Sequence, residues 1–274
     1  MLKKLLKHEW RRLWKVPTAL LVILQIFAFL SGLGFMAPVW ESQVAGLSLL
    51  VGLVWTMFFI AVIGVGLAIN IYLALQFYRS MYSDEGYLTH TLPVSSGQLL
   101  FAKSLVMVVW AVISVLGVIL SVLIFGFTGI LCYFSGIDWG VVISDIRIGF
   151  NELIQDLGVW EIKWVHILTS LIGVLISLCY STALIVSSIT IGQLVRKHRV
   201  MAAFAVGCVI STVVSILQNL LQLPLINNTF YEENINIILI MFNAAWIQYL
   251  FYLVITAALF AASNYIIRNR LNLE

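Results

Sequence analysis

Residues 46–76 read GLSLLVGLVWTMFFIAVIGVGLAINIYLALQ and contain no charged side chain. As a helix rising about 1.5 Å per residue, the stretch would be roughly 46 Å long, whereas the hydrocarbon core of a bilayer is about 30 Å thick. Apolar residues occur on every side of such a helix, without the alternation of a half-buried strand. Lipid also leaves helices and closed barrels as the only spanning structures. The stretch therefore predicts a membrane-spanning helix that tilts or projects beyond the bilayer.

Five other windows of the 274-residue chain have the same character. Charged residues make up 10% of the chain and hydrophobic residues 62%, whereas a soluble domain carries about 25% charged residues. All four prolines fall at the ends of the apolar runs or in loops, where a helix can stop. We predict an all-α integral membrane protein, a single transmembrane domain over 1–274, with six spans at 17–38, 46–76, 103–134, 165–192, 200–222 and 236–266.

The distribution of charge predicts the orientation. If the N-terminus is cytosolic, the inner segments hold every Lys and Arg of the chain except Arg147 and Lys163. Cytosolic loops of membrane proteins carry such an excess of Lys and Arg. Most of the acidic residues fall on the opposite side. We therefore expect both termini in the cytosol, which makes the segment between the second and third spans a cytosolic loop.

Two segments outside the spans are amphipathic. In residues 1–15, apolar side chains recur at steps of three and four between basic ones, which predicts a helix lying in the interface near anionic headgroups. A plain topology anchor is the alternative. In residues 136–163, predicted to be external, Phe150, Ile154 and Leu157 share one helical face with their neighbours. We expect a short helix there, either on the outer leaflet or capping an outer vestibule.

Several kinds of chemistry are missing from the sequence. The chain contains no Gly-Lys pair and so no P-loop, and it has neither HExxH nor GxSxG. Its three cysteines have no CxxC spacing and its four histidines are scattered, so a metal site or a membrane-embedded enzyme is not supported. Nothing indicates nucleic-acid binding. We expect a chain that is not itself an enzyme and binds no cofactor.

The middle of each span carries no charge, although ion-coupled transporters place carboxylates or histidines there. The polar residues in the spans are neutral, and Gln25 and Asn70 are the candidates for lining a substrate path. A hydrogen bond between helices is the alternative for both.

Residues 83–100, SDEGYLTHTLPVSSGQLL, form a cytosolic loop with two helix starts. Ser83 is a good N-cap, and Asp84 and Glu85 then lie in the first turn, where the helix dipole favours acidic groups. The short helix ends at Pro93. Ser95 and Gln98 then form a Ser-x-x-Gln capping box for the helix that leads into the third span.

The loop resembles the corresponding loop of ABC type-2 permeases, in particular bacterial exporters of the bacitracin, lantibiotic and antimicrobial-peptide type. Residues 77–105, FYRSMYSDEGYLTHTLPVSSGQLLFAKSL, carry the similarity through Glu85-Gly86-Tyr87-Leu88, Thr91-Leu92-Pro93-Val94-Ser95 and Lys103. The similarity by motif covers about thirty residues, and the outline of the remaining chain agrees with it.

This resemblance implies a coupling helix at residues 83–93 that docks on a separate cytosolic ABC ATPase subunit, which would bind ATP and Mg²⁺. It also implies an elbow helix at 1–15, a second permease chain in a homo- or heterodimer, contact with membrane lipid, and the plasma membrane of a bacterium. Export of a peptide, lipid-like compound or drug would follow. The residues expected to dock on the ATPase are Asp84, Glu85, Tyr87, Leu88, Leu92 and Pro93.

The sequence departs from the family pattern in one respect. Many members carry their external element between the fifth and sixth spans, whereas that loop is short here, at 223–235, and the larger one follows the third span. Analogies about substrate handling are weakened by this difference. The alternative functions are an ATP-independent channel or secondary transporter, and a non-transporting membrane partner of a resistance or sensing complex.

Overall fold

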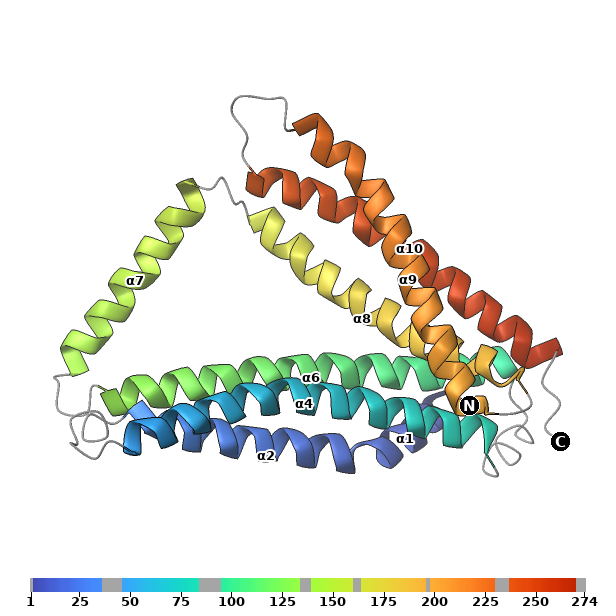
Figure 1. Ribbon diagram of the computed structural model, residues 1–274, viewed down its shortest axis with the longest axis horizontal. Coiled ribbons are helices and arrows are strands. Elements are labelled where there is room, and N and C mark those ends of the chain that lie inside the picture. The colour runs from blue at the N-terminus through green and yellow to red at the C-terminus, as the bar shows by residue number, and fades with distance from the viewer. Residues whose placement is uncertain are drawn as a thin grey trace. The chain divides into compact units, whose positions relative to one another are not determined.

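The computed structural model describes residues 2–35, 46–83, 95–133, 139–159, 164–195, 198–229 and 237–269. The described residues form helices and short connections, without a strand (Figure 1). In chain order the elements are α1 (Leu2–Leu13), α2 (Lys15–Gly32), the 3-10 turn η1 (Leu33–Phe35), α4 (Leu47–Tyr82), α6 (Ser96–Tyr133), α7 (Trp139–Val159), α8 (Trp164–Gly192), α9 (Arg199–Thr229) and α10 (Ile237–Asn269).

Within these residues, six helices are long and apolar enough to cross a membrane: α2, α4, α6, α8, α9 and α10. The predicted fold class, all-α with six spans, is confirmed. The orientation of the termini stays a prediction, as does the external position of α7, which lies within the 136–163 segment.

The helices extend further than the predicted spans at several ends. α4 continues to Tyr82, beyond the predicted end of the second span at 76. α6 begins at Ser96, directly after the predicted cap at Ser95 and ahead of the third span at 103. Hydropathy marks where a helix meets polar surroundings, but a helix continues until a breaker or cap ends it. α9 likewise runs past Pro224 to Thr229, so the expectation that this proline ends the helix is wrong. The ring removes one N–H but does not by itself stop a membrane helix.

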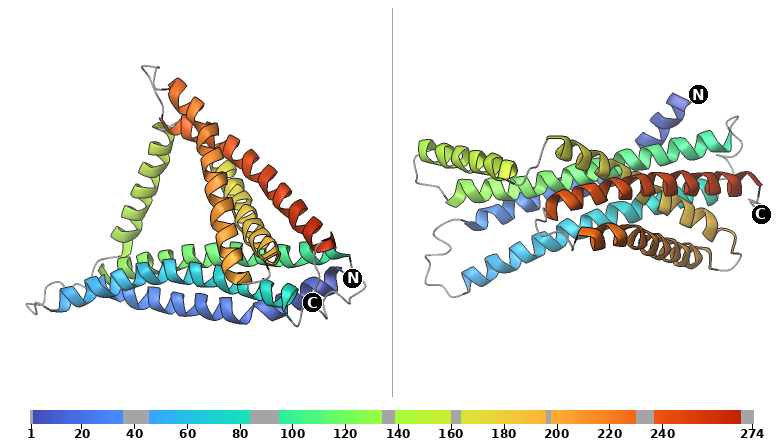
Figure 2. Two further views of the ribbon diagram at one scale, coloured as in Figure 1. Left: turned by 45° about the vertical axis from the view of Figure 1, so that its right-hand side comes forward. Right: turned by 90° about the horizontal axis from the view of Figure 1, so that it is seen from above.

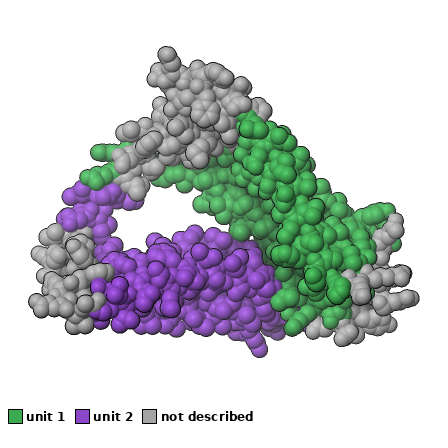
Figure 3. Space-filling view, in the orientation of Figure 1, with its two compact units in different colours: residues 1–6, 74–108, 151–274 green, residues 7–73, 109–150 purple. Residues whose placement is uncertain are grey.

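The chain divides into two compact units (Figure 3). Unit 2 comprises residues 7–73 and 109–150. Its core joins α2, α4 and α6 around Phe58, which is 0% exposed and stacks on Phe125 with ring centroids 4.9 Å apart. Gly32 lies so close to Thr128 that an added Cβ would overlap this side chain. Small residues at such crossings let membrane helices approach closely.

Unit 1 comprises residues 1–6, 74–108 and 151–274. In it α8 packs against α9 and α10, and the three helices lie together in every view (Figures 1 and 2). The buried side of α8 consists mostly of small residues, and its hydroxyls bond within their own helix, as Ser188 Oγ does to the carbonyl of Leu184 at 2.6 Å. Gly173 meets the ring of Tyr249, and Gly192 meets the backbone of Ala203.

Candidate functional site

The predicted coupling helix at 83–93 lies outside the described residues from its second position onward, so all six predicted docking residues do as well. The structure describes the two helix ends that hold this loop. These are the end of α4 at Tyr82 and the start of α6 after Ser95, and both belong to unit 1.

The first helix end is fixed to α8. Tyr82 is 8% exposed, and its hydroxyl forms a hydrogen bond with Oγ1 of Thr190, which is 0% exposed, at 2.8 Å. Phe77 packs edge-on against the Tyr82 ring, with centroids 6.2 Å apart. A buried hydrogen bond between two side chains far apart in the sequence fixes the direction in which α4 ends.

The second helix end is capped locally and lies against α10. The backbone N–H of Gln98 donates to Oγ of Ser95 at 3.4 Å, so the predicted cap at Ser95 is confirmed. One turn of α6 then packs on α10, because a Cβ at Gly97 would lie 3.3 Å from Oδ1 of Asn264. Lys103, the last residue of the family-like pattern, is buried at 3% exposed. Both flanks of the polar loop are thus anchored in unit 1.

Gln25 and Asn70 both form hydrogen bonds within the protein. Nε2 of Gln25 on α2 donates to the carbonyl oxygen of Gly117 on α6 at 2.8 Å, which is the alternative expected from the sequence. Its Oε1 is buried without a partner among the described residues. Nδ2 of Asn70 donates to the carbonyl of Gly66 one turn earlier, at 2.8 Å. A role for either residue in a substrate path stays a prediction.

The amphipathic helix α1 lies within the predicted elbow segment 1–15. It exposes Lys3, Lys4, Lys7 and Arg11 and buries Leu13. Trp10 stacks on Trp110 of α6 with ring centroids 4.9 Å apart and an interplanar angle of 21°. The helix therefore contacts α6 through an aromatic pair, while the four cations named above stay exposed.

A cluster of polar side chains that was not predicted from the sequence lies where α8, α9 and α10 meet. The hydroxyl of Tyr252 donates to Oε1 of Gln218 at 2.8 Å, and its ring stacks on Tyr180 with centroids 4.5 Å apart. One turn away, Nε2 of Gln222 approaches Oε1 of Gln248 at 3.5 Å. Gln218 and Gln222 on α9 are four residues apart, and so are Gln248 and Tyr252 on α10. This spacing places both side chains of a pair on one face of their helix, and it is the signal by which the sequence could have indicated the cluster.

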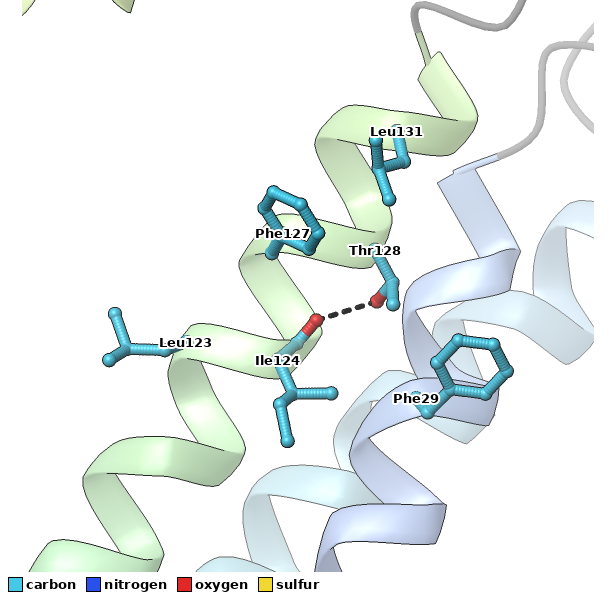
Figure 4. Close-up of a pocket in the computed structure, with 6 residues that line it drawn as sticks. All are labelled: Phe29, Leu123, Ile124, Phe127, Thr128 and Leu131. Atoms are coloured by element: carbon cyan, nitrogen blue, oxygen red, sulfur yellow. Dashed lines mark hydrogen bonds between the residues drawn. The ribbon is translucent and has the colours of Figure 1, made fainter.

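Two other features of the described residues concern metal ions and lipid. No group of His, Cys, Asp and Glu among them could hold a metal ion. A groove between α2 and α6, with a volume of about 620 Å³, is lined by Phe29, Leu123, Ile124, Phe127, Thr128 and Leu131 (Figure 4). The hydroxyl of Thr128 is engaged with the carbonyl of Ile124 at 2.7 Å, so the groove is apolar and suits a lipid chain.

No family model, no curated protein and no solved structure matches the chain.

Proposed function

We propose that the chain is the membrane-spanning subunit of an ATP-binding cassette transporter of the type-2 permease kind, located in a bacterial plasma membrane. A separate cytosolic ATPase supplies the energy, and the cargo is a peptide, lipid-like compound or drug that is exported. Two permease chains, identical or related, complete the transporter. The support consists of the six apolar helices, the family-like loop sequence and the absence of a P-loop.

The observation that carries the proposal is that the two helix ends flanking the polar loop contact other helices of unit 1. The hydrogen bond between Tyr82 and Thr190 joins one loop end to α8, and Gly97 near the other loop end closely approaches Asn264 of α10. A loop that transmits force from a soluble partner needs such contacts, because a frayed helix end would absorb the movement.

Docking of the ATPase is expected to depend on the loop. Glu85→Ala combined with Leu92→Ala removes one charge and one apolar side chain from the proposed docking helix. We expect a clear loss of co-purification with a co-expressed ABC ATPase subunit that the unchanged chain retains, with membrane insertion unchanged. Glu152→Ala with Ile154→Ala is the matched control, because it removes the same kinds of side chain from exposed positions on α7, on the predicted external side. Equal retention of the ATPase by both double variants would reject the docking assignment.

The isolated chain is expected to hydrolyse no ATP, since it lacks a phosphate-binding loop. Phosphate release by the purified chain in lipid nanodiscs measures this, with the ATPase added back as a positive control. Turnover by the chain alone would contradict the proposal. A complex that forms and hydrolyses ATP but moves no cargo would instead favour a non-transporting resistance or sensing partner.

A further inference from the structure

The polar residues of α9 and α10 form facing pairs in a regular register. Gln222 faces Gln248, and Gln218 faces Tyr252 one turn further along. From the first pair to the second, the residue number falls by four on α9 and rises by four on α10, as expected for two antiparallel helices. Four residues correspond to about 6 Å along a helix. We call these four residues the glutamine ladder. Thr256 lies four residues beyond Tyr252 on α10, and its Oγ1 is buried without a hydrogen-bond partner among the described residues.

An aromatic surface adjoins the ladder. The rings of Tyr180 on α8 and Tyr252 on α10 are parallel, with an interplanar angle of 1° and centroids 4.5 Å apart. Both side chains are only partly buried, and so are the three glutamines. Hydrogen-bonding amides and flat apolar surface therefore occur side by side at one place in unit 1.

Among the described residues, the ladder leaves much of its hydrogen-bonding capacity unused. A glutamine amide has two N–H donors and an acceptor oxygen with two lone pairs. Gln218 uses its oxygen for Tyr252, but its N–H groups have no partner among the described residues, and the contact from Gln222 to Gln248 is long at 3.5 Å. Unpaired amide groups are costly in hydrocarbon, because lipid supplies neither donors nor acceptors. This face is consequently a poor surface for lipid and a good one for a polar partner.

The partner should carry no net charge at this point. Residues 167–192, 200–229 and 237–267 contain no Asp, Glu, Lys, Arg or His, so these stretches of the three helices offer no counter-ion to a ligand at the ladder. An ion at that depth would be expensive without one. A peptide amide suits the site, since it has the same donor and acceptor as a glutamine side chain and can bond to it in both directions.

We propose that the glutamine ladder binds an uncharged, amide-bearing amphipath, such as a membrane-dissolved peptide. Backbone amides of the ligand bond to Gln218, Gln222 and Gln248, and an apolar ligand side chain lies on the Tyr180–Tyr252 surface. The inference deepens the proposed function by giving the cargo a chemical class and a binding site. Only the statement that this ligand is the transported cargo rests on the proposed function, because binding itself needs no ATPase.

The test uses the full chain in lipid nanodiscs and the probe dansyl-Leu-Ala-Leu-amide, with empty nanodiscs to subtract partition into lipid. We expect saturable binding by dansyl fluorescence. Gln218→Leu with Gln222→Leu should raise the Kd about tenfold, since interhelical bonds of this kind are individually modest and two are lost. An ester analogue, with oxygen in place of the N–H of the Ala–Leu peptide bond, should bind more weakly to the natural chain and equally to the double variant.

Two controls separate a binding role from a structural one. Thr212→Val lies on α9 as well, but its exposed hydroxyl is already bonded to the carbonyl of Cys208 at 2.8 Å, so probe binding should be unchanged. Tyr252→Phe is the second variant: it keeps the stacked ring but removes the hydroxyl that holds Oε1 of Gln218, so it should weaken binding several-fold without unfolding the chain. Absent saturable binding, equal binding of amide and ester to the natural chain, or an equal loss in Thr212→Val would each overturn the proposal.

One further outcome assigns the ladder to a different partner. If the glutamine double variant lowers the mass of the purified protein from dimer to monomer, the ladder is an interface between copies of the chain, and the proposal is overturned. Failure of the proposed function is seen elsewhere, in the co-purification of the ATPase, because the probe is measured on the chain alone.

Discussion

Gly192→Ala is expected to lower the free energy of unfolding by about 3 kcal/mol, the upper part of the range for overpacked sites. Gly192 is the last residue of α8, and an added Cβ would lie 2.6 Å from both Cα and N of Ala203 on α9. These are backbone atoms, so no side chain can rotate away and the two helices must separate. Thermal unfolding of the purified chain in detergent, followed by near-ultraviolet circular dichroism, measures the loss.

The separation of α8 from α9 should also reach the polar loop. Thr190 lies two residues before Gly192 and holds Tyr82, so displacement of this end of α8 weakens the anchor of α4. We expect Gly192→Ala to reduce ATPase co-purification in parallel with the unfolding temperature. Gly64→Ala is the control, because nothing lies within 4 Å of its added Cβ, and in a helix it should gain up to about 1 kcal/mol. Equal destabilisation by both variants would show that the contact with Ala203 is not the cause.

The membrane environment explains why the sequence predicts the helices so well. Lipid demands long apolar segments with all backbone groups satisfied, so the apolar run of 46–76 could only be a spanning helix. The ends of the same helices depend on local events that hydropathy does not record. Ser95 was predictable because a cap is a local interaction, whereas the extension of α4 to Tyr82 was not, because it is accompanied by a tertiary bond to Thr190.

The residues of the candidate site likewise differ in how far the sequence alone predicts their contacts. Gln25 and Asn70 were visible as polar residues in apolar runs, but only the structure reveals that one bonds to Gly117 and the other to its own helix. The glutamine ladder depends on the register between α9 and α10, which no local pattern specifies. The spacing of Gln218 and Gln222 indicated a polar face without indicating what it meets.

Trp110→Ala is expected to be the other strongly destabilising change, at about 3 kcal/mol, which is typical of truncating a buried aromatic side chain. Trp110 is 2% exposed, and its ring stacks on that of Trp10 of α1. Without that ring, α1 loses its stacking partner and should leave the bundle more often. Unfolding in detergent measures the stability, and the rate of trypsin cleavage after Lys7 or Arg11 measures the release of α1, which should rise about tenfold or more.

Trp110→Phe separates the ring from its polar atom. Nε1 of Trp110 is buried without an acceptor among the described residues, and a buried unpaired donor costs about 1–3 kcal/mol. Phenylalanine removes this donor and keeps an aromatic face for Trp10, so the loss of packing and the relief of the unpaired N–H should nearly cancel. We expect stability within about 1 kcal/mol of the natural chain and unchanged cleavage of α1. A phenylalanine variant as unstable as the alanine variant would mean that the size of the indole, and not the stacked pair, holds α1 in place.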